Sequence, residues 1–318
     1  MKLKPPSAVV LLGAQRFEPT LRAAVDELGV TGRIATITAG WQERENEDEE
    51  LAAHLGQRTV NLRLHARGEE LFAADPELRA AHRQRQEALR NRQDFYRIRL
   101  EHELEADRVI RQRVAPPEII AEQAEESIEA IRELDRWHLM HCARQHRAFG
   151  ERWRLRERPS VRRHREQIEA LIDGCAAVAI SGGHVASLIN RLSLFGIGHL
   201  LGGRAVFAWS AGAMAVSDRV VLFHDDPPQG PGASELLDSG LGLCPGVVVF
   251  PEPEQRLRLD RKERVADLAR RFAPAICLAL PARSRVTFRG GRLSSIHGVQ
   301  QLRPDGEHAA FDPQAIAR

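Results

Sequence analysis

The N-terminal residues 1–75 show short apolar runs that alternate with segments of helical periodicity. Between the runs, leucines and alanines recur at helical spacing, which indicates helices with one buried face. The pattern predicts strands and helices in alternation: residues 8–12, 19–28, 33–38, 47–55 and 59–64. This order is typical of a parallel sheet with helices on its faces. We therefore expect residues 1–75 to form the first part of an α/β domain.

Residues 76–158 differ in kind, because they contain almost no glycine and are rich in Arg, Glu, Gln, Ala and Leu. Pro116 and Pro117 divide the helical pattern into two arms, residues 76–114 and 118–149. Each arm would be roughly 50 Å long at 1.5 Å per residue. Apolar positions of the second arm follow helical spacing, while the opposite face is charged: Ile119, Ile128, Ile131, Leu134 and Leu139. We expect an inserted antiparallel helical hairpin that packs on itself or on a neighbouring subunit and supports at least a dimer.

The alternating pattern returns in residues 159–318, which we assign to the second part of the α/β domain. Helices and strands again follow one another: residues 160–173, 176–180, 185–195 and 204–209. Two strand ends in this stretch carry small and polar residues, Ser181-Gly182-Gly183-His184 and Ser210-Ala211-Gly212-Ala213. The carboxyl ends of parallel strands are where such folds place their functional side chains.

The composition is that of a soluble globular protein, with 43% hydrophobic and 28% charged residues. These values exclude a wholly disordered, collagen-like or membrane-embedded chain. The 46 basic and 44 acidic residues give a net charge of +2, and arginines and acids are nearly balanced in the hairpin. We therefore expect no nucleic-acid partner.

The N-terminal apolar stretch is too short for a signal peptide or a membrane span, so we expect no membrane partner. Four dispersed cysteines, without a C-x-x-C pair, fit reduced thiols better than a disulfide framework: Cys142, Cys175, Cys244 and Cys277. Both features predict a cytoplasmic protein.

The second arm of the hairpin contains a possible metal-binding pattern. His138, Cys142 and His146 follow at four-residue spacing, and Asp135 lies one turn before His138. Two of these side chains could share a metal on one helix face. The other interpretation is that they are packing or surface residues, and with no matching ligand cluster on the first arm we expect neither a metal nor a cofactor.

Ser210 lies between an apolar strand and a run of small residues, which is what a nucleophile elbow requires. The sharp turn would lift its hydroxyl above the carboxyl edge of the sheet. The amide of Ala211, at the start of the next helix, would face an oxyanion formed there. Gly182 and Gly183 could bring a second backbone donor close, because they lack side chains. Alternatively, the small residues only permit close packing of strand and helix.

The chain resembles the cyanophycinase and dipeptidase E family of serine peptidases, whose fold is similar to that of class I glutamine amidotransferases. Four segments carry the resemblance: residues 180–184, 208–213, 218–221 and 240–249. It covers residues 160–300 and, more loosely, 7–64, but not the hairpin.

This resemblance implies a three-layer α/β/α sandwich with a mostly parallel, doubly wound sheet. It implies that Ser210 is the nucleophile and that the amides of Gly183 and Ala211 form the oxyanion hole. The family reaction is hydrolysis of a peptide bond beside an acidic residue, so the implied substrate is small and peptide-like or acidic.

The rest of the family's triad is not evident in this chain. The family histidine is expected just after the strand at Val247–Val249, but the sequence there reads Phe250-Pro251-Glu252-Pro253-Glu254. Glu252 occupies the histidine's place, and the next histidine along the chain is His297. The acidic partner is also missing after residues 276–280, where Pro281-Ala282-Arg283-Ser284 follow. A serine hydroxyl without a base within hydrogen-bond reach is a poor nucleophile.

Three residues are candidates for the base. His184 lies on the loop expected to face Ser210, and His224 is followed by Asp225 and Asp226, either of which could orient it. Glu252 could serve if burial raised its proton affinity. Each has a plainer role available: His184 in a ligand pocket, His224 at a strand end and Glu252 on the surface.

Two classes of function follow from these residues. The first is a serine hydrolase that acts through Ser210. The second is a non-catalytic protein of the same fold that binds a ligand at the carboxyl edge of the sheet and a partner through the hairpin. The missing histidine favours the second class, and the retained elbow favours the first.

Overall fold

The computed structural model describes residues 4–225 and 232–311. Within these residues, seven strands form the central sheet in the order β11-β10-β1-β5-β4-β2-β3. Five are parallel: β1 (Ala8–Leu12), β2 (Ile34–Ile37), β3 (Thr59–Asn61), β4 (Ala177–Ile180) and β5 (Ala205–Trp209). The other two, β10 (Arg285–Arg289) and β11 (Arg292–His297), extend the sheet beyond β1 in antiparallel fashion. The chain thus has a mixed α/β fold built on a large, mostly parallel sheet, as the sequence pattern predicts.

The central strands are buried on both faces, which explains why β1 is a continuous apolar run. Val10 and Leu12 of β1 pack with α1 (Leu21–Glu27) and with residues around α2 (Glu49–His54). Val9 and Leu11 belong to a larger core on the opposite face. That core includes residues of three helices: α3 (Leu64–Ala74), α6 (Pro159–Asp173) and α7 (Val185–Phe195). Helix α3 and the short 3-10 helices η1 (Ala39–Arg44) and η2 (Ile197–His199) do not follow from the sequence pattern.

The C-terminal part forms two further sheets. Within the described residues, β8 (Val247–Pro251), β9 (Ile276–Leu280), β12 (Gln300–Leu302) and β13 (His308–Ala310) form one, in the order β13-β12-β9-β8. The other pairs β6 (Arg219–Leu222) with β7 (Glu235–Ser239). The sequence pattern predicts the strands near residues 220, 247 and 276, but it does not predict that they form sheets separate from the central one. They cannot join beside β1 or β5, because both edges of each are already paired.

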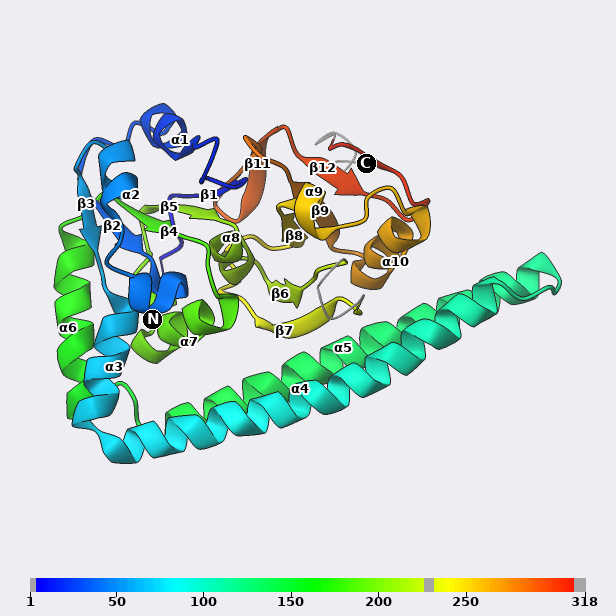
Figure 1. The fold of residues 1–318 in the computed structure, drawn as a ribbon, viewed down its shortest axis with the longest axis horizontal. Helices are drawn as coiled ribbons and strands as arrows, with labels where there is room; N and C mark the ends of the chain where they lie inside the picture. The colour runs from blue at the N-terminus through cyan, green and yellow to red at the C-terminus, as the bar shows by residue number, and fades with distance from the viewer. Residues whose placement is uncertain (1–3, 226–231, 312–318) are drawn as a thin grey trace.

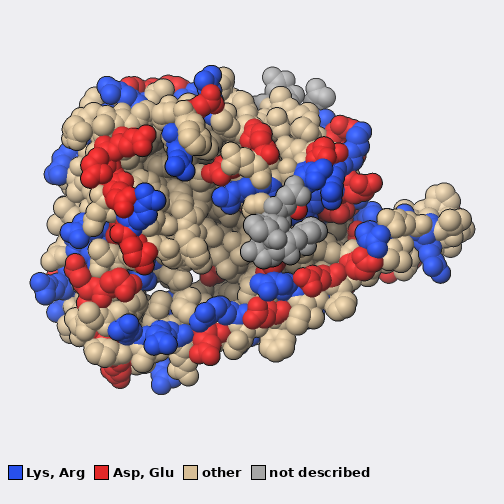
Figure 2. All heavy atoms as spheres, in the orientation of Figure 1, with Lys and Arg blue, Asp and Glu red and all other residues tan. Residues whose placement is uncertain are grey.

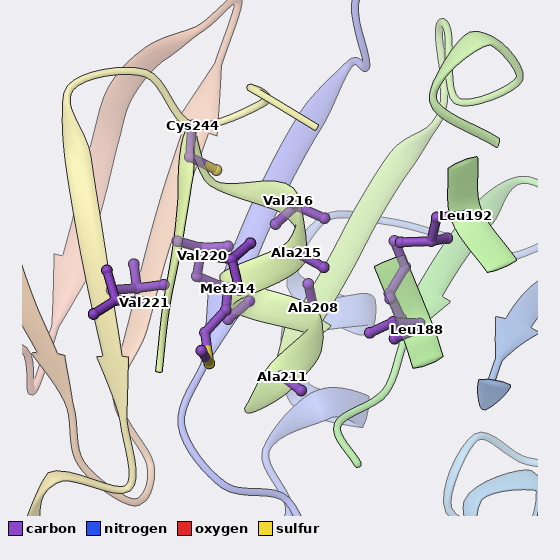
Figure 3. Packing of buried hydrophobic residues seen from close by; sticks show 14 of the residues in the cluster. Leu188, Leu192, Ala208, Ala211, Met214, Ala215, Val216, Val220, Val221 and Cys244 are labelled. Carbon is purple, nitrogen blue, oxygen red and sulfur yellow. The ribbon is translucent and has the colours of Figure 1, made fainter. Parts of the chain in front are cut away.

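Helix α8 (Ala211–Val216) lies in the core between the sheets, and all of its residues are buried. Figure 3 shows α8 between Leu188 of α7 on one side and Val220 and Cys244 on the other. The remaining helices of this part are α9 (Pro253–Arg256) and α10 (Lys262–Phe272). The short, small-residue sequence of α8 allows it to pack this closely.

The inserted hairpin consists of α4 (Pro76–Arg111) and α5 (Pro117–Trp153). Proline stands at the start of each helix, and the Asp75 side chain caps α4 by accepting a hydrogen bond from the Leu78 amide at 3.1 Å. Figure 1 shows the hairpin lying along one side of the α/β part, with its far end projecting well beyond it. Among the helices of the described residues, none combines the length and apolar character needed to cross a lipid bilayer.

A buried polar network joins the hairpin to the α/β part. Arg271 of α10 donates to both oxygens of Asp135 at 2.7 Å and to the Tyr96 hydroxyl at 2.7 Å. Tyr96 in turn donates to Asp135 at 2.7 Å and accepts from the Leu236 amide of β7 at 3.2 Å. Because α4, α5, α10 and β7 all contribute, the network sets how the hairpin sits on the core.

Candidate active site

Ser210 is the last residue before α8 and has φ 48° and ψ −124°. A residue other than glycine rarely adopts a positive φ, because this backbone conformation is strained. It persists only where the surrounding structure enforces it. The strand β5, the strained serine and the short helix α8 form a sharp strand-to-helix turn, called the elbow below, and a nucleophile elbow would require such a turn. The structure thus gives Ser210 the local conformation on which the nucleophile hypothesis depends.

Two glycines allow this turn to form. A Cβ added to Gly182 would lie 2.7 Å from the Ser210 Cβ, and one added to Gly212 would lie 2.2 Å from the Ile180 carbonyl oxygen. Both distances are shorter than the closest approach of two nonbonded atoms. The loop after β4 and the start of α8 therefore approach the elbow through residues that have no side chain.

The Ser210 hydroxyl donates a hydrogen bond to Glu252 Oε1 at 2.8 Å. Glu252 follows β8 and has φ 56° and ψ 48°, which is the left-handed region. The structure therefore brings one of the three candidate bases, the residue in the expected place of the family histidine, into direct contact with the serine.

The second carboxylate oxygen of Glu252 is paired with Arg256. The Nε of Arg256 lies 3.3 Å from Glu252 Oε2, and the Glu252 side chain is 22% exposed. The carboxylate therefore has a positive charge beside it and is in contact with water. The full burial on which the sequence-based hypothesis for Glu252 depended is therefore not observed.

His184 caps a helix instead of contacting the serine. Its Nδ1 accepts from the Ser187 amide at 3.2 Å at the start of α7, and it lies 3.0 Å from Ser187 Oγ. Within the described residues, no hydrogen bond joins His184 to Ser210. Gln42, which the sequence analysis did not single out, donates to Ser187 Oγ at 2.8 Å and has φ 57° and ψ −122°. A positive φ at a non-glycine residue leaves no signal in the sequence.

His224 is exposed, and its neighbour Asp225 forms hydrogen bonds with two arginine residues. Asp225 accepts two hydrogen bonds from the Arg264 guanidinium, at 2.7 and 2.9 Å, and one from the Arg258 amide at 2.7 Å. The buried Asp225 carboxylate therefore joins α10 to the loop after β6, and it does not orient His224. Asp226 lies outside the described residues.

The predicted oxyanion donors follow two neighbouring strands of the sheet: Gly183 lies on the loop between β4 and α7, and Ala211 begins α8 after β5. In the part of the chain that the structure describes, neither the Ala211 amide nor the Gly183 amide donates a hydrogen bond. Gly183 has φ 107° and packs against Gly40, where an added Cβ would lie 2.4 Å from the carbonyl carbon and oxygen. An added Cβ on Gly182 would lie 3.5 Å from the Ala211 nitrogen, so this loop does approach the elbow.

The residues of the possible metal site each have a partner within the protein. His138 stacks on Tyr96 with ring centroids 4.1 Å apart, and its Nε2 lies 3.7 Å from Cys142 Sγ. His146 Nε2 is 2.6 Å from Asp238 Oδ2. Burial raises the pKa of the Cys142 thiol to about 12, which disfavours the thiolate that metals bind. No group of three potential ligands with metal-site geometry occurs among the described residues.

A cavity of about 650 Å³ lies away from Ser210, between the hairpin and the amino end of the sheet. Its lining includes His146, Asp238, Ile189 and Leu241, but neither Ser210 nor Glu252. Figure 2 shows a separate hollow of mostly uncharged surface in the middle of the face drawn, over the position of α8 in Figure 1.

Comparisons with known proteins do not show a family. No family model matches the chain, and no curated protein matches it. One solved structure that is similar is that of a peptidase from an acI-B1 Actinobacterium, at 15% identity and a TM-score of 0.45. The match covers 98% of this chain and 99% of that one. A likeness this weak does not show a shared activity or substrate, so membership of the cyanophycinase and dipeptidase E family stays a prediction.

Proposed function

We propose that the protein is a serine hydrolase in which Ser210 is the nucleophile and Glu252 accepts its proton. The observation that carries this proposal is the 2.8 Å hydrogen bond from the Ser210 hydroxyl to the Glu252 carboxylate. The donor stands at a strained strand-to-helix turn, where a nucleophile is accessible to a substrate. This function rests on the contact itself and on the sequence resemblance.

The reaction would proceed by acyl transfer. Ser210 Oγ would attack the substrate carbonyl carbon while its proton moves to Glu252, and the oxyanion would face the Ala211 and Gly183 amides. Collapse of the intermediate would break the bond to the leaving group, which takes the proton from Glu252. Water would then attack the acyl carbon while Glu252 accepts its proton, and this proton would return to Ser210 Oγ as the ester bond breaks.

The site favours slow chemistry and an acidic substrate. A carboxylate is in general a weaker base than imidazole, so we expect modest rates. The Arg256 side chain is 45% exposed and places a positive charge beside the site, which suits the small, acidic, peptide-like substrate that the resemblance implies.

The alternative is a non-catalytic ligand-binding protein of the same fold. The Glu252–Arg256 ion pair supports it. The contacts from Ser210 to Glu252 and from Glu252 to Arg256 would then hold three polar side chains in a fixed arrangement that binds a ligand. In that case Ser210 would donate to Glu252 permanently and would not be activated.

Labelling with a fluorophosphonate probe tests the proposal. We expect the wild-type protein to be labelled and Ser210→Ala not to be. Glu252→Gln keeps the shape of the side chain but removes the base, and we expect it to label about 100-fold more slowly, which is the lower end of general-base effects. His224→Asn, which removes an exposed histidine, should label at the wild-type rate.

Other outcomes would redirect the assignment. Labelling that survives in Glu252→Gln and is lost in His184→Asn would make the histidine the base. A well-folded wild-type protein that is not labelled would favour the non-catalytic function.

A further inference from the structure

The hairpin has an uneven charge distribution along its length. Residues 101–133, which include its projecting end, contain ten acidic and four arginine side chains. The remaining parts, 76–100 and 134–153, contain eleven arginine and five acidic side chains. Figure 2 shows mainly blue side chains where the hairpin lies beneath the α/β part, a row of red ones where it leaves it, and tan and blue ones on the part that projects beyond it. One end of the hairpin is thus acidic and the other basic.

Large apolar side chains are exposed near the middle of both helices. On α5, Trp137 is 48% exposed and Met140 is 39% exposed, and on α4, Phe95 is 70% exposed. Arg99 of α4 lies over the Trp137 ring at 5.5 Å, so residues of the two helices meet in this patch. We call Phe95, Arg99, Trp137 and Met140 the central patch. Exposed aromatic residues beside arginine are the side chains that most often dominate protein interfaces.

On α5, opposite charges flank the central patch on the same side of the helix. Glu126, Trp137 and Arg144 are separated by eleven and seven residues, which are close to whole numbers of helical turns. Neither Glu126 nor Arg144 forms an ion pair within the described residues. The two cannot pair with each other in one chain, because 18 residues of helix separate them by about 27 Å.

This order, acidic then apolar then basic, is self-complementary when a second copy lies antiparallel. We propose that the protein forms a two-fold symmetric dimer in which the outer faces of two hairpins pack antiparallel, with the central patch at the axis. Glu126 of each copy then faces Arg144 of the other, and the acidic end of one hairpin covers the basic end of its partner. An isologous contact requires this reciprocity, in which residue i meets j and j meets i.

Mass measurement in solution tests the dimer first. Light scattering or sedimentation should give about twice the 35.6 kDa of one chain at micromolar concentration. Trp137→Glu should weaken the dimer Kd by about 30-fold or more, the size of effect seen at a central aromatic residue. Phe17→Glu is the matched control, because Phe17 is 82% exposed but lies outside the hairpin, and it should leave the Kd unchanged.

A charge exchange tests the antiparallel arrangement. Glu126→Arg and Arg144→Glu should each weaken the dimer by about 3- to 10-fold, because each places like charges together twice. The double variant Glu126→Arg/Arg144→Glu should restore the wild-type Kd. In a parallel two-fold dimer each of these residues would instead face its own copy, so neither single variant would weaken the dimer. A monomeric wild-type protein at 100 µM, or a dimer unaffected by Trp137→Glu, would overturn the proposal.

Discussion

Ser210 and Glu252 both have a positive φ, and both follow the last residue of a strand. Such conformations cost of order 1–3 kcal/mol each and persist only when the surroundings enforce them. Here the enforcing contacts come from different parts of the chain, since Gly182 packs on Ser210 and the Glu252 amide donates to the Leu280 carbonyl at 3.3 Å. Two strained residues in direct contact are typical of a functional site and unusual for one that serves packing alone.

His82 is a buried residue whose pKa is lowered by its surroundings. It is 7% exposed, its ring lies 4.8 Å from that of Phe72, and its Nε2 has no partner among the described residues. Burial, aided by the nearby charges of Arg85 and Arg191, lowers the pKa of His82 to about 3. In the folded protein the ring is therefore neutral at every physiological pH.

We predict that His82 makes folding stability depend on pH. The unfolded chain takes up a proton near pH 6.5, but the folded chain does so only near pH 3, so stability is greatest above pH 6.5 and declines as the pH falls between these values. The decline should approach about 1.4 kcal/mol per pH unit for this group. His82→Gln should flatten the curve from urea unfolding at pH 4.5 to 7.5, and His224→Gln, at an exposed position, should not. Equal slopes for both variants would show that His82 does not titrate in this way.

At the scale of elements, the position of α8 determines whether the elbow can form. The helix is buried on all sides, and its Gly212 lies against the carbonyl oxygens of Ile180 and Ser181 at the end of β4. The strand, the turn and the helix are thus held by contacts with a neighbouring strand end.

Gly212→Ala should therefore destabilise the protein and displace the elbow. The added methyl group would lie 2.2 Å from the Ile180 carbonyl oxygen, and overpacking of this kind costs typically about 1–3 kcal/mol. Gly150→Ala is the matched control, because an added Cβ there meets nothing within 4 Å in helix α5, and we expect it to stabilise by about 0.5–1 kcal/mol. Thermal unfolding of both variants measures the difference, and equal stabilities would contradict the close approach of α8 to β4.

At the scale of the whole molecule, the hairpin and the α/β part are joined by the buried Asp135–Arg271 pair. The side chains are 4% and 2% exposed, and the pair links residues far apart in the sequence. A buried charge that loses its partner is costly, whereas removal of both charges is tolerated far better.

Asp135→Asn should thus lower the free energy of unfolding by about 3–5 kcal/mol, because Arg271 stays buried without a counter-charge. The double variant Asp135→Leu/Arg271→Met should recover most of this loss. Glu166→Gln, which breaks the exposed pair with Arg162, should cost less than about 1 kcal/mol. Urea unfolding provides all three values, and a double variant as unstable as Asp135→Asn would mean that the network acts through something other than the ion pair.

The local pattern of the sequence by itself determined the central strands, the two long helices of the hairpin and the small-residue turn at Ser210. These features depend on periodicity, on prolines and on glycines, which act between near neighbours. Only the tertiary structure decided which candidate base contacts the serine, because Glu252 lies 42 residues from Ser210 and His184 turned out to cap a helix. It likewise decided that Asp225 and Asp135 bind arginines of α10, that β8 and β9 form a separate sheet, and that the hairpin lies against β7 and α10. Such contacts depend on how distant segments pack, and that is set by the whole core and not by any one stretch of sequence.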